Sequence, residues 1–275
     1  MVSGARQAPG RGAALGGDRG AEPCAATHTD RALRRRRRAY WSFNLYPDAG
    51  EGGGCFVPTL RRKPVGEGAP DTERSQEEAA RRARSKLRRY CAANRLNRFA
   101  TLTYAGAGCF EPQQLRVDVA DFFRGLRREL GSEPLPYAWA SEWHPRGHGL
   151  HVHFAVGRYV GQELIREVWG RGITHIKLIG DLPVGSGALE EARRAAAYLA
   201  KYVSKNIGDE RIPRLHRYEV AQGFQPEKVP LSGDSYRAVI ALASERMGGA
   251  PVRVWRSSEQ EGWRGAPAYS CAWAG

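Results

Sequence analysis

The sequence predicts an α+β protein built around an antiparallel β-sheet, and three observations lead to this class. Segments rich in β-branched and aromatic residues alternate with segments whose apolar residues recur every three or four positions, the periods of strands and helices. The turn-like linker His144–His148 joins two strand-like segments and predicts a hairpin. With 275 residues, the chain is long enough for one large domain or for a core domain with appendages.

The expected elements follow one another between residues 98 and 206. The helix Gln113–Leu130 places Leu115, Val119 and Phe122 on one face and ends at Gly131. The helix Leu189–Asn206 ends near Gly208. A short helix covers Gly161–Trp169, and the expected strands are Arg98–Tyr104, Tyr137–Trp143, Gly149–Val156 and Ile173–Ile179.

The resulting order, β-α-β-β-α-β-α, matches the ferredoxin-like split βαβ arrangement in its first six elements. In that arrangement the third strand lies centrally and pairs with the second, and we expect the helices on one face of the sheet. The last helix can then cross the sheet face.

Composition divides the chain into three parts. Residues 1–70 are rich in Gly, Ala, Pro and Arg and are expected to form a disordered basic arm, which contains the basic run Arg34–Arg38. Within this arm, Tyr40–Tyr46 could form a short strand or an aromatic patch that docks on the domain. Residues 71–210 form the expected main domain, which opens with a helix from Asp71 through the basic stretch to Arg89. Residues 211–275 are an extension, expected to be partly ordered, with a possible strand at Val252–Trp255.

The charge balance points to a polyanionic partner. The chain has 43 Lys and Arg against 29 Asp and Glu, a formal net charge of +14, and phosphate neutralisation supplies most sequence-independent affinity for nucleic acid. We find no apolar run long enough for a membrane span and no apolar core of a secretory signal. The five scattered cysteines fit a reducing compartment, so a cytoplasmic location without membrane contact is expected.

A candidate metal site lies at the expected hairpin. His151 and His153 are two apart on a strand and therefore point to the same face, where they could share a metal ion or be ordinary half-buried histidines. Glu142 lies beside them if the hairpin pairs residues 142 and 151. Two histidines and one carboxylate leave positions open for a substrate oxygen, and Mg²⁺ or Mn²⁺ suits a phosphodiester. His144 and His148, in the turn, could replace a ligand, contact DNA or have no role.

A second candidate group lies on the last helix. Tyr198 and Tyr202 are four apart and share a helix face, and Lys201 and Lys205 each follow a tyrosine by three. A nearby cation favours the phenolate, so this face could supply a nucleophile for a phosphate. The same spacing also fits a packed amphipathic helix whose lysines extend to solvent.

Together, the motifs resemble those of the HUH endonucleases, and most closely the rolling-circle replication initiators of plasmids and single-stranded DNA phages. The resemblance covers about residues 75–208. It rests on Phe99–Tyr104, on Glu142 with Arg146-Gly147 and His151–Phe154, and on Tyr198 through Lys205.

The resemblance implies an HUH endonuclease fold and a function. Such proteins nick one strand at a replication origin: a tyrosine becomes joined to the 5′ end, and a free 3′-OH is left for a host polymerase. By this likeness His151, His153 and Glu142 would be metal ligands, Tyr198 and Tyr202 would alternate as nucleophiles, and Lys201 and Lys205 would position the phosphate or metal. Thr101 and Thr103 match the first motif, whose role is mainly structural or in DNA binding. The sequence has no P-loop, so a host helicase would unwind the duplex.

Two other classes stay open. One is a transposase or relaxase with the same chemistry, although the order of the motifs and the chain length favour the initiator. The other is a non-catalytic ferredoxin-like protein that binds single strands by stacking bases on exposed aromatic side chains.

Overall fold

The computed structural model describes residues 38–59, 72–177, 187–205, 218–263 and 265–274. All helices and strands below belong to one unit, Ala39–Gly275. They form two five-stranded antiparallel sheets, which we call the first and the second sheet by their order in the chain.

The second sheet has the strand order predicted from the sequence. It consists, in spatial order, of β6 (Thr174–Lys177), β3 (Arg98–Thr103), β5 (Leu150–Val156), β4 (Tyr137–Trp143) and β7 (Tyr218–Val220). Its first four members are the four predicted strands in the order fourth, first, third, second, and β5 pairs with β4 as a hairpin. The sheet is therefore compatible with a ferredoxin-like arrangement, which β7 extends by one strand at the β4 edge.

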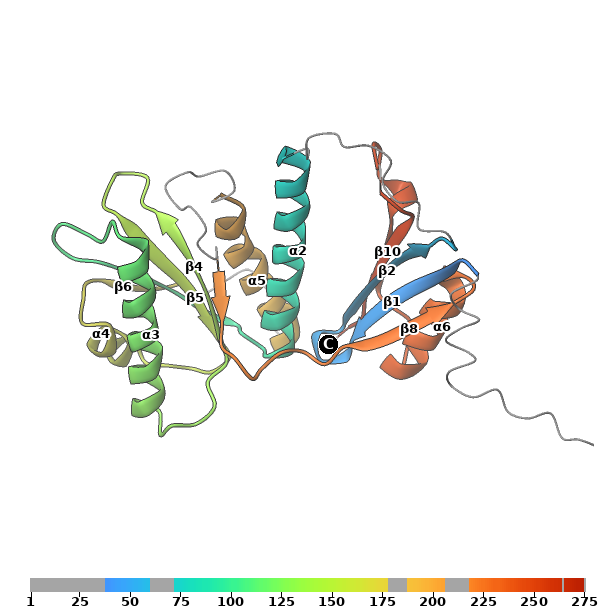
Figure 1. Ribbon diagram of the computed structural model, residues 1–275. Coiled ribbons are helices and arrows are strands. Elements are labelled where there is room, and N and C mark those ends of the chain that lie inside the picture. Colours follow the sequence, from blue (N-terminus) through green and yellow to red (C-terminus); the bar gives the residue numbers. More distant parts are fainter. Residues whose placement is uncertain (1–37, 60–71, 178–186, 206–217, 264, 275) are drawn as a thin grey trace, which may run out of the picture. The chain divides into compact units, whose positions relative to one another are not determined.

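Helices cover both faces of the second sheet (Figure 1), so the expectation of helices on one face is wrong. Residues 150, 152 and 154 of β5 pack against α3 (Pro112–Glu129) and α4 (Gln162–Trp169) in one apolar cluster. Ala155 lies on the opposite face, in a cluster with side chains of α2 (Thr72–Ala93) and α5 (Gly187–Lys205). Because successive residues of a strand point to opposite faces, an almost fully apolar β5 requires cover on both sides.

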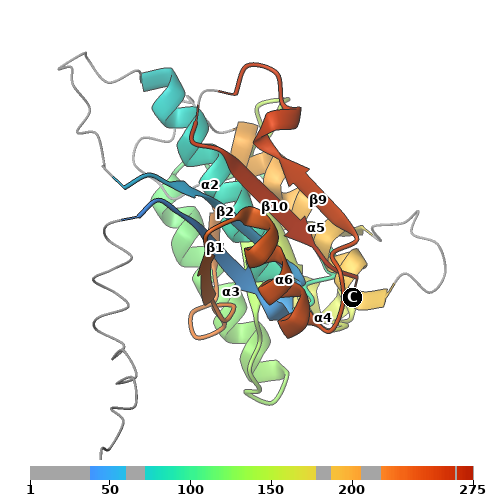
Figure 2. The ribbon, with the colours of Figure 1, turned by 90° about the vertical axis from the view of Figure 1, so that its right-hand side faces the viewer.

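The first sheet joins strands from distant parts of the sequence. Its spatial order is β8 (Val229–Gly233), β1 (Tyr40–Tyr46), β2 (Glu51–Val57), β10 (Ala268–Ala272) and β9 (Arg253–Arg256). Helix α6 (Tyr236–Met247) covers one face of this sheet, and Figure 2 shows it in front of β1. Two short 3₁₀ helices, Pro47–Ala49 and Ser257–Glu259, complete the described elements.

The expectation of a disordered arm up to residue 70 is wrong for β1 and β2, although the sequence allowed a strand at Tyr40–Tyr46. The glycines at positions 52–54 interrupt the strand signal, yet packing requires two of them. A Cβ on Gly52 would lie 2.4 Å from Phe43 Cζ, and a Cβ on Gly54 would lie 1.9 Å from the Ser42 carbonyl oxygen. The β1 residues therefore occupy the space that side chains on β2 would need.

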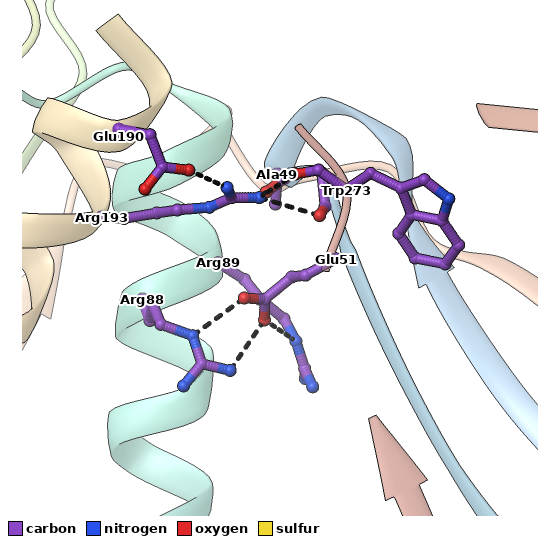
Figure 3. A network of polar contacts seen from close by, with 8 residues as sticks. Ala49, Glu51, Arg88, Arg89, Glu190, Arg193 and Trp273 are labelled. Carbon is purple, nitrogen blue, oxygen red and sulfur yellow. Dashed lines mark hydrogen bonds and ion pairs between the residues drawn. The ribbon is translucent and has the colours of Figure 1, made fainter. Parts of the chain in front are cut away.

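Arginines of α2 and α5 bind the first sheet through a polar network (Figure 3). The buried Glu51 carboxylate accepts hydrogen bonds from Arg88 Nε at 2.8 Å and from Arg89 Nε at 2.9 Å. Arg193 Nη2 donates to the carbonyl oxygens of Ala49, Gly50 and Trp273 at 3.2, 2.8 and 3.1 Å. These contacts connect the first sheet to the two helices that cover one face of the second.

The remaining boundaries agree closely with the sequence predictions. Strand β4 coincides with the predicted Tyr137–Trp143, and α3 and β9 begin within one residue of their expected starts. The run Arg34–Arg37, Asp71, Leu178–Ile179, Asn206 and Gly208 lie outside the described residues. Among the described helices, none is both long and apolar enough to cross a membrane.

Candidate nucleolytic site

Strand pairing brings the predicted metal ligands to one face of the second sheet. Glu142 of β4 lies directly opposite His151 of β5, as the hairpin predicted. On the other side of β5, Thr101 and Thr103 of β3 lie opposite His153 and His151. Because directly opposed residues share a face, these side chains all point toward α5.

His153 lies between a carboxylate and a hydroxyl. Its Nε2 is 3.0 Å from Glu142 Oε2, and its Nδ1 is 2.9 Å from Thr101 Oγ1. An ionised carboxylate only accepts hydrogen bonds, so in this arrangement Nε2 donates to Glu142 and Nδ1 accepts from the threonine hydroxyl. Both members of the His153–Glu142 pair are largely buried, with side chains 8% and 19% exposed.

His151 is held neutral. Burial, with further contributions from His144 and His153, lowers its pKa to about 4, so its ring carries no charge at neutral pH. Its Nε2 is buried and has no hydrogen-bond partner among the described residues. Its ring also stacks on His144, with ring centroids 4.4 Å apart. A neutral imidazole with an unpaired ring nitrogen is the form that binds a metal ion.

The tyrosines of α5 reach the same face of the sheet. The Tyr202 ring stacks on His153, with centroids 3.7 Å apart and planes inclined by 15°. Tyr198 packs edge-on against Phe99 at 4.8 Å and against Tyr202 at 5.6 Å. Burial, and then the hydrogen bond with Tyr198, raises the pKa of Tyr202, so this phenol ionises less readily than a free one.

Small side chains allow α5 to lie close to the sheet. Ala138, Ala140 and Ala155 form its surface beneath the helix, and Ala196 faces them from α5. All four are fully buried. The close approach places a tyrosine ring of the helix directly on a histidine ring of the strand.

The two lysines differ in what the structure describes. Lys201 is exposed, and its Nζ lies 5.2 Å from the centroid of the Tyr198 ring, a cation–π contact. The side chain of Lys205 lies outside the described part of the chain, although its backbone closes α5. Only the first lysine can therefore be placed beside a tyrosine.

The donor set suits a metal ion in type, but its members are not spread around an empty centre. Within the described residues, no group of three or more His, Cys, Asp or Glu side chains is arranged to hold a metal. Instead His153 and Glu142 bond directly to each other, and the unpaired Nε2 of His151 lies on the same face. An ion would bind here by displacing the proton that His153 and Glu142 share.

Three contacts within the site were not predicted from the sequence. Phe99 contacts both His153 and Tyr198, at 5.8 and 4.8 Å between ring centroids. His144, treated as a turn residue, stacks on His151, and Thr101 bonds His153. Phe99 lies two residues before Thr101 on β3, so the two-residue period of a strand could have placed it on the site face once that face was known.

Comparison with known proteins agrees with this placement. Residues 97–207 match a family model whose description begins "Replication-associated protein ORF2", and the match covers less than half of the chain. No curated protein and no solved structure matches the chain. The matched segment contains every residue of the site described above, and it is similar to a family of replication-associated proteins.

Proposed function

We propose that the chain is a replication initiator that nicks single-stranded origin DNA by tyrosine transesterification. The observation that carries this proposal is the stack of Tyr202 on His153, which in turn bonds Glu142. A phenol, two imidazoles and a carboxylate meet on one buried face, within a segment similar to replication-associated proteins.

In the proposed reaction, a tyrosine hydroxyl attacks the scissile phosphorus. A bond forms between the tyrosine oxygen and the phosphorus, the bond from phosphorus to the 3′ oxygen breaks, and the phenolic proton ends on the released 3′-OH. Tyr198 and Tyr202 lie within one helical turn, so a second attack by the other tyrosine could transfer the strand at the end of a round. The 3′-OH would prime a host polymerase, and a host helicase would open the duplex.

His151, His153 and Glu142 would hold a Mg²⁺ or Mn²⁺ ion. When bound, such an ion polarises the phosphoryl oxygens and stabilises the charge that develops on them. Lys201, beside Tyr198, would add positive charge near the phosphate. The low exposure of the His153–Glu142 pair strengthens these electrostatic interactions, because water screens them less.

A nicking assay on a labelled single-stranded oligonucleotide with Mn²⁺ tests the proposal. The wild-type chain should form a covalent protein–DNA adduct that survives denaturing electrophoresis. Tyr198→Phe and Tyr202→Phe should each lower the adduct yield, and the double variant should form none. Tyr159→Phe, an exposed tyrosine away from α5, is the matched control and should behave like the wild type.

Each negative outcome points elsewhere. An adduct that persists in the double variant would move the nucleophile to another residue. If no adduct forms with any origin-derived sequence while binding to single strands remains, the chain would be a non-catalytic binding protein. His151→Ala should abolish metal-dependent cleavage and leave salt-sensitive DNA binding largely intact. A relaxase or transposase of the same chemistry would show strand transfer without origin-dependent replication.

A further inference from the structure

The first sheet has a face that no helix packs against through apolar contacts among the described residues. Trp41, Phe43 and Leu45 of β1 point to the α6 side, where they form the apolar cluster. By strand alternation, Tyr40, Ser42, Asn44 and Tyr46 point to the opposite side. We call this opposite side the polar face.

The polar face has a low floor bordered by aromatic side chains. Gly53 of β2 and Ser270 of β10 are cross-strand partners in its middle, and both are only partly buried. Trp255 of β9 lies opposite Ser270 on the same face, so it stands beside this floor, with Tyr40 at the far end of β1. Neither Tyr40 nor Trp255 belongs to an apolar cluster of the described residues.

Arginines of α2 contact the aromatic rings along this face. The Arg89 guanidinium lies 4.4 Å from the centroid of the Tyr46 ring, and the Arg81 guanidinium lies 5.1 Å from that of Trp263. Trp263 in turn packs edge-on against Trp255 at 5.5 Å. Cationic and aromatic groups therefore alternate along the polar face.

The charge of this region is positive after its ion pairs are counted. Glu51 pairs with two arginines, Arg88 and Arg89, so one positive charge stays uncompensated within that triad. The Arg88 side chain remains 44% exposed. Arg253 is exposed on β9, two residues before Trp255 and hence on the same face. These cations outnumber the carboxylate beside them, which favours a polyanionic ligand.

We propose that the polar face, with the arginines of α2, is a binding path for single-stranded DNA outside the nicking site. Alternating arginines and partly exposed aromatic rings suit a single strand, because its unstacked bases can stack on rings while its phosphates contact cations. A duplex offers no free base faces. The choice of DNA over RNA rests on the proposed function, and the face lies outside the segment that matches the replication-associated family.

Gly53 offers a sharp test, because a side chain fits there. A Cβ at this position would meet its nearest neighbours, Tyr269 O, Ser270 Cβ and Arg89 Nη2, at 3.6, 3.8 and 3.9 Å, which are ordinary contacts. Gly53→Glu would place a carboxylate on the floor beside Arg89. Gly53→Gln is the matched neutral variant, and Gly53→Ala checks that the fold tolerates a Cβ.

Binding is measured by fluorescence anisotropy with a labelled oligothymidylate of roughly 16 nucleotides. The background is the Tyr198→Phe, Tyr202→Phe double variant without metal, so binding is read independently of nicking. Gly53→Glu and Trp255→Ala should each weaken binding about tenfold, and Gly53→Gln should weaken it less than Gly53→Glu. Arg246→Glu, an exposed arginine on α6 on the other side of the sheet, should change binding little at matched salt.

Unchanged affinity in both Gly53→Glu and Trp255→Ala, with folding intact by circular dichroism, would overturn the proposal. Equal weakening by Arg246→Glu would also overturn it, because general charge and not this face would then carry the binding. Tighter binding of oligouridylate than of oligothymidylate would overturn the choice of DNA. If nicking fails but these variants behave as expected, the path stands and the proposed enzymatic function does not.

Discussion

The Thr101 hydroxyl oxygen lies 2.9 Å from His153 Nδ1, on the side of the ring opposite Glu142. A hydroxyl can both donate and accept a hydrogen bond. It can therefore donate to Nδ1 when Nε2 carries the proton, and accept from Nδ1 when Nε2 binds a metal ion. Thr101 keeps the ring oriented in both states, which makes it a positioning residue for the candidate site.

Replacing this hydroxyl should weaken metal binding. Thr101→Val keeps the shape of the side chain and removes the partner of Nδ1, and we expect a loss of roughly 10- to 100-fold in Mn²⁺ affinity. Isothermal titration with Mn²⁺ measures it. Thr103→Val, the same change one pair further along β3, is the control, and Thr101→Ser should restore most of the affinity. Equal losses at positions 101 and 103 would contradict a specific role.

Two neighbouring glycines should respond in opposite ways to one added methyl group. Gly54→Ala would bring Cβ to 1.9 Å from the Ser42 carbonyl oxygen and force β1 and β2 apart, which should cost about 3 kcal/mol of unfolding free energy. Gly53→Ala meets only ordinary contacts and should change stability by less than about 0.5 kcal/mol. Urea denaturation of the two variants compares them directly. A large loss in Gly53→Ala would contradict the described packing.

Arg193 should be important for stability. Its side chain is 10% exposed and donates to three carbonyl groups, so Arg193→Met would leave these acceptors without their charged donor. We expect a loss of about 3 kcal/mol in unfolding free energy, measured by urea denaturation. Arg193→Lys should recover part of it, because an ammonium cannot reproduce the planar fork. Arg194→Met, an exposed neighbour on the same helix, should have little effect.

Tyr90 should make stability fall in alkaline solution. Burial raises its pKa above the ordinary value, and its hydroxyl donates to the Ala221 carbonyl oxygen at 3.0 Å. Above a pH of about 10 the unfolded chain loses this proton first, so it binds fewer protons than the folded chain and stability falls as pH rises. Tyr90→Phe should reduce this slope and cost about 1 kcal/mol at neutral pH. Denaturation midpoints between neutral and alkaline pH test both effects, with Tyr159→Phe as the exposed control.

The convergence of Glu142, His151 and His153 on one face was predictable from the sequence, because a hairpin and the two-residue period of a strand fix it. The shared face of Tyr198 and Tyr202 followed in the same way from the period of a helix. Which face of the sheet α5 would cover was not predictable from these local rules. Nor was the hydrogen-bond partner of His153 on β3, since the pairing of β3 with β5 joins segments about 50 residues apart.

The first sheet escaped the sequence analysis for a similar reason. Its central strand β2 carries three consecutive glycines, which weaken every local strand signal. Its partners, β1 and β10, come from distant ends of the described chain, so only the ring of Phe43 above Gly52 explains why the glycines are needed. The roles assigned to the site residues remain predictions, because the geometry brings them together without testing their chemistry.

Ala138, Ala140 and Ala155 act as a gauge for the candidate site. Their methyl groups set the gap between sheet and helix, and that gap fixes how far the phenol of α5 extends over the imidazole of β5. A larger side chain at any of them would work as a shim, lifting the helix without altering any reacting group. The catalytic reach of this chain would then be set by three of its smallest and chemically most inert side chains, so selection for activity should act on them as strictly as on the histidines.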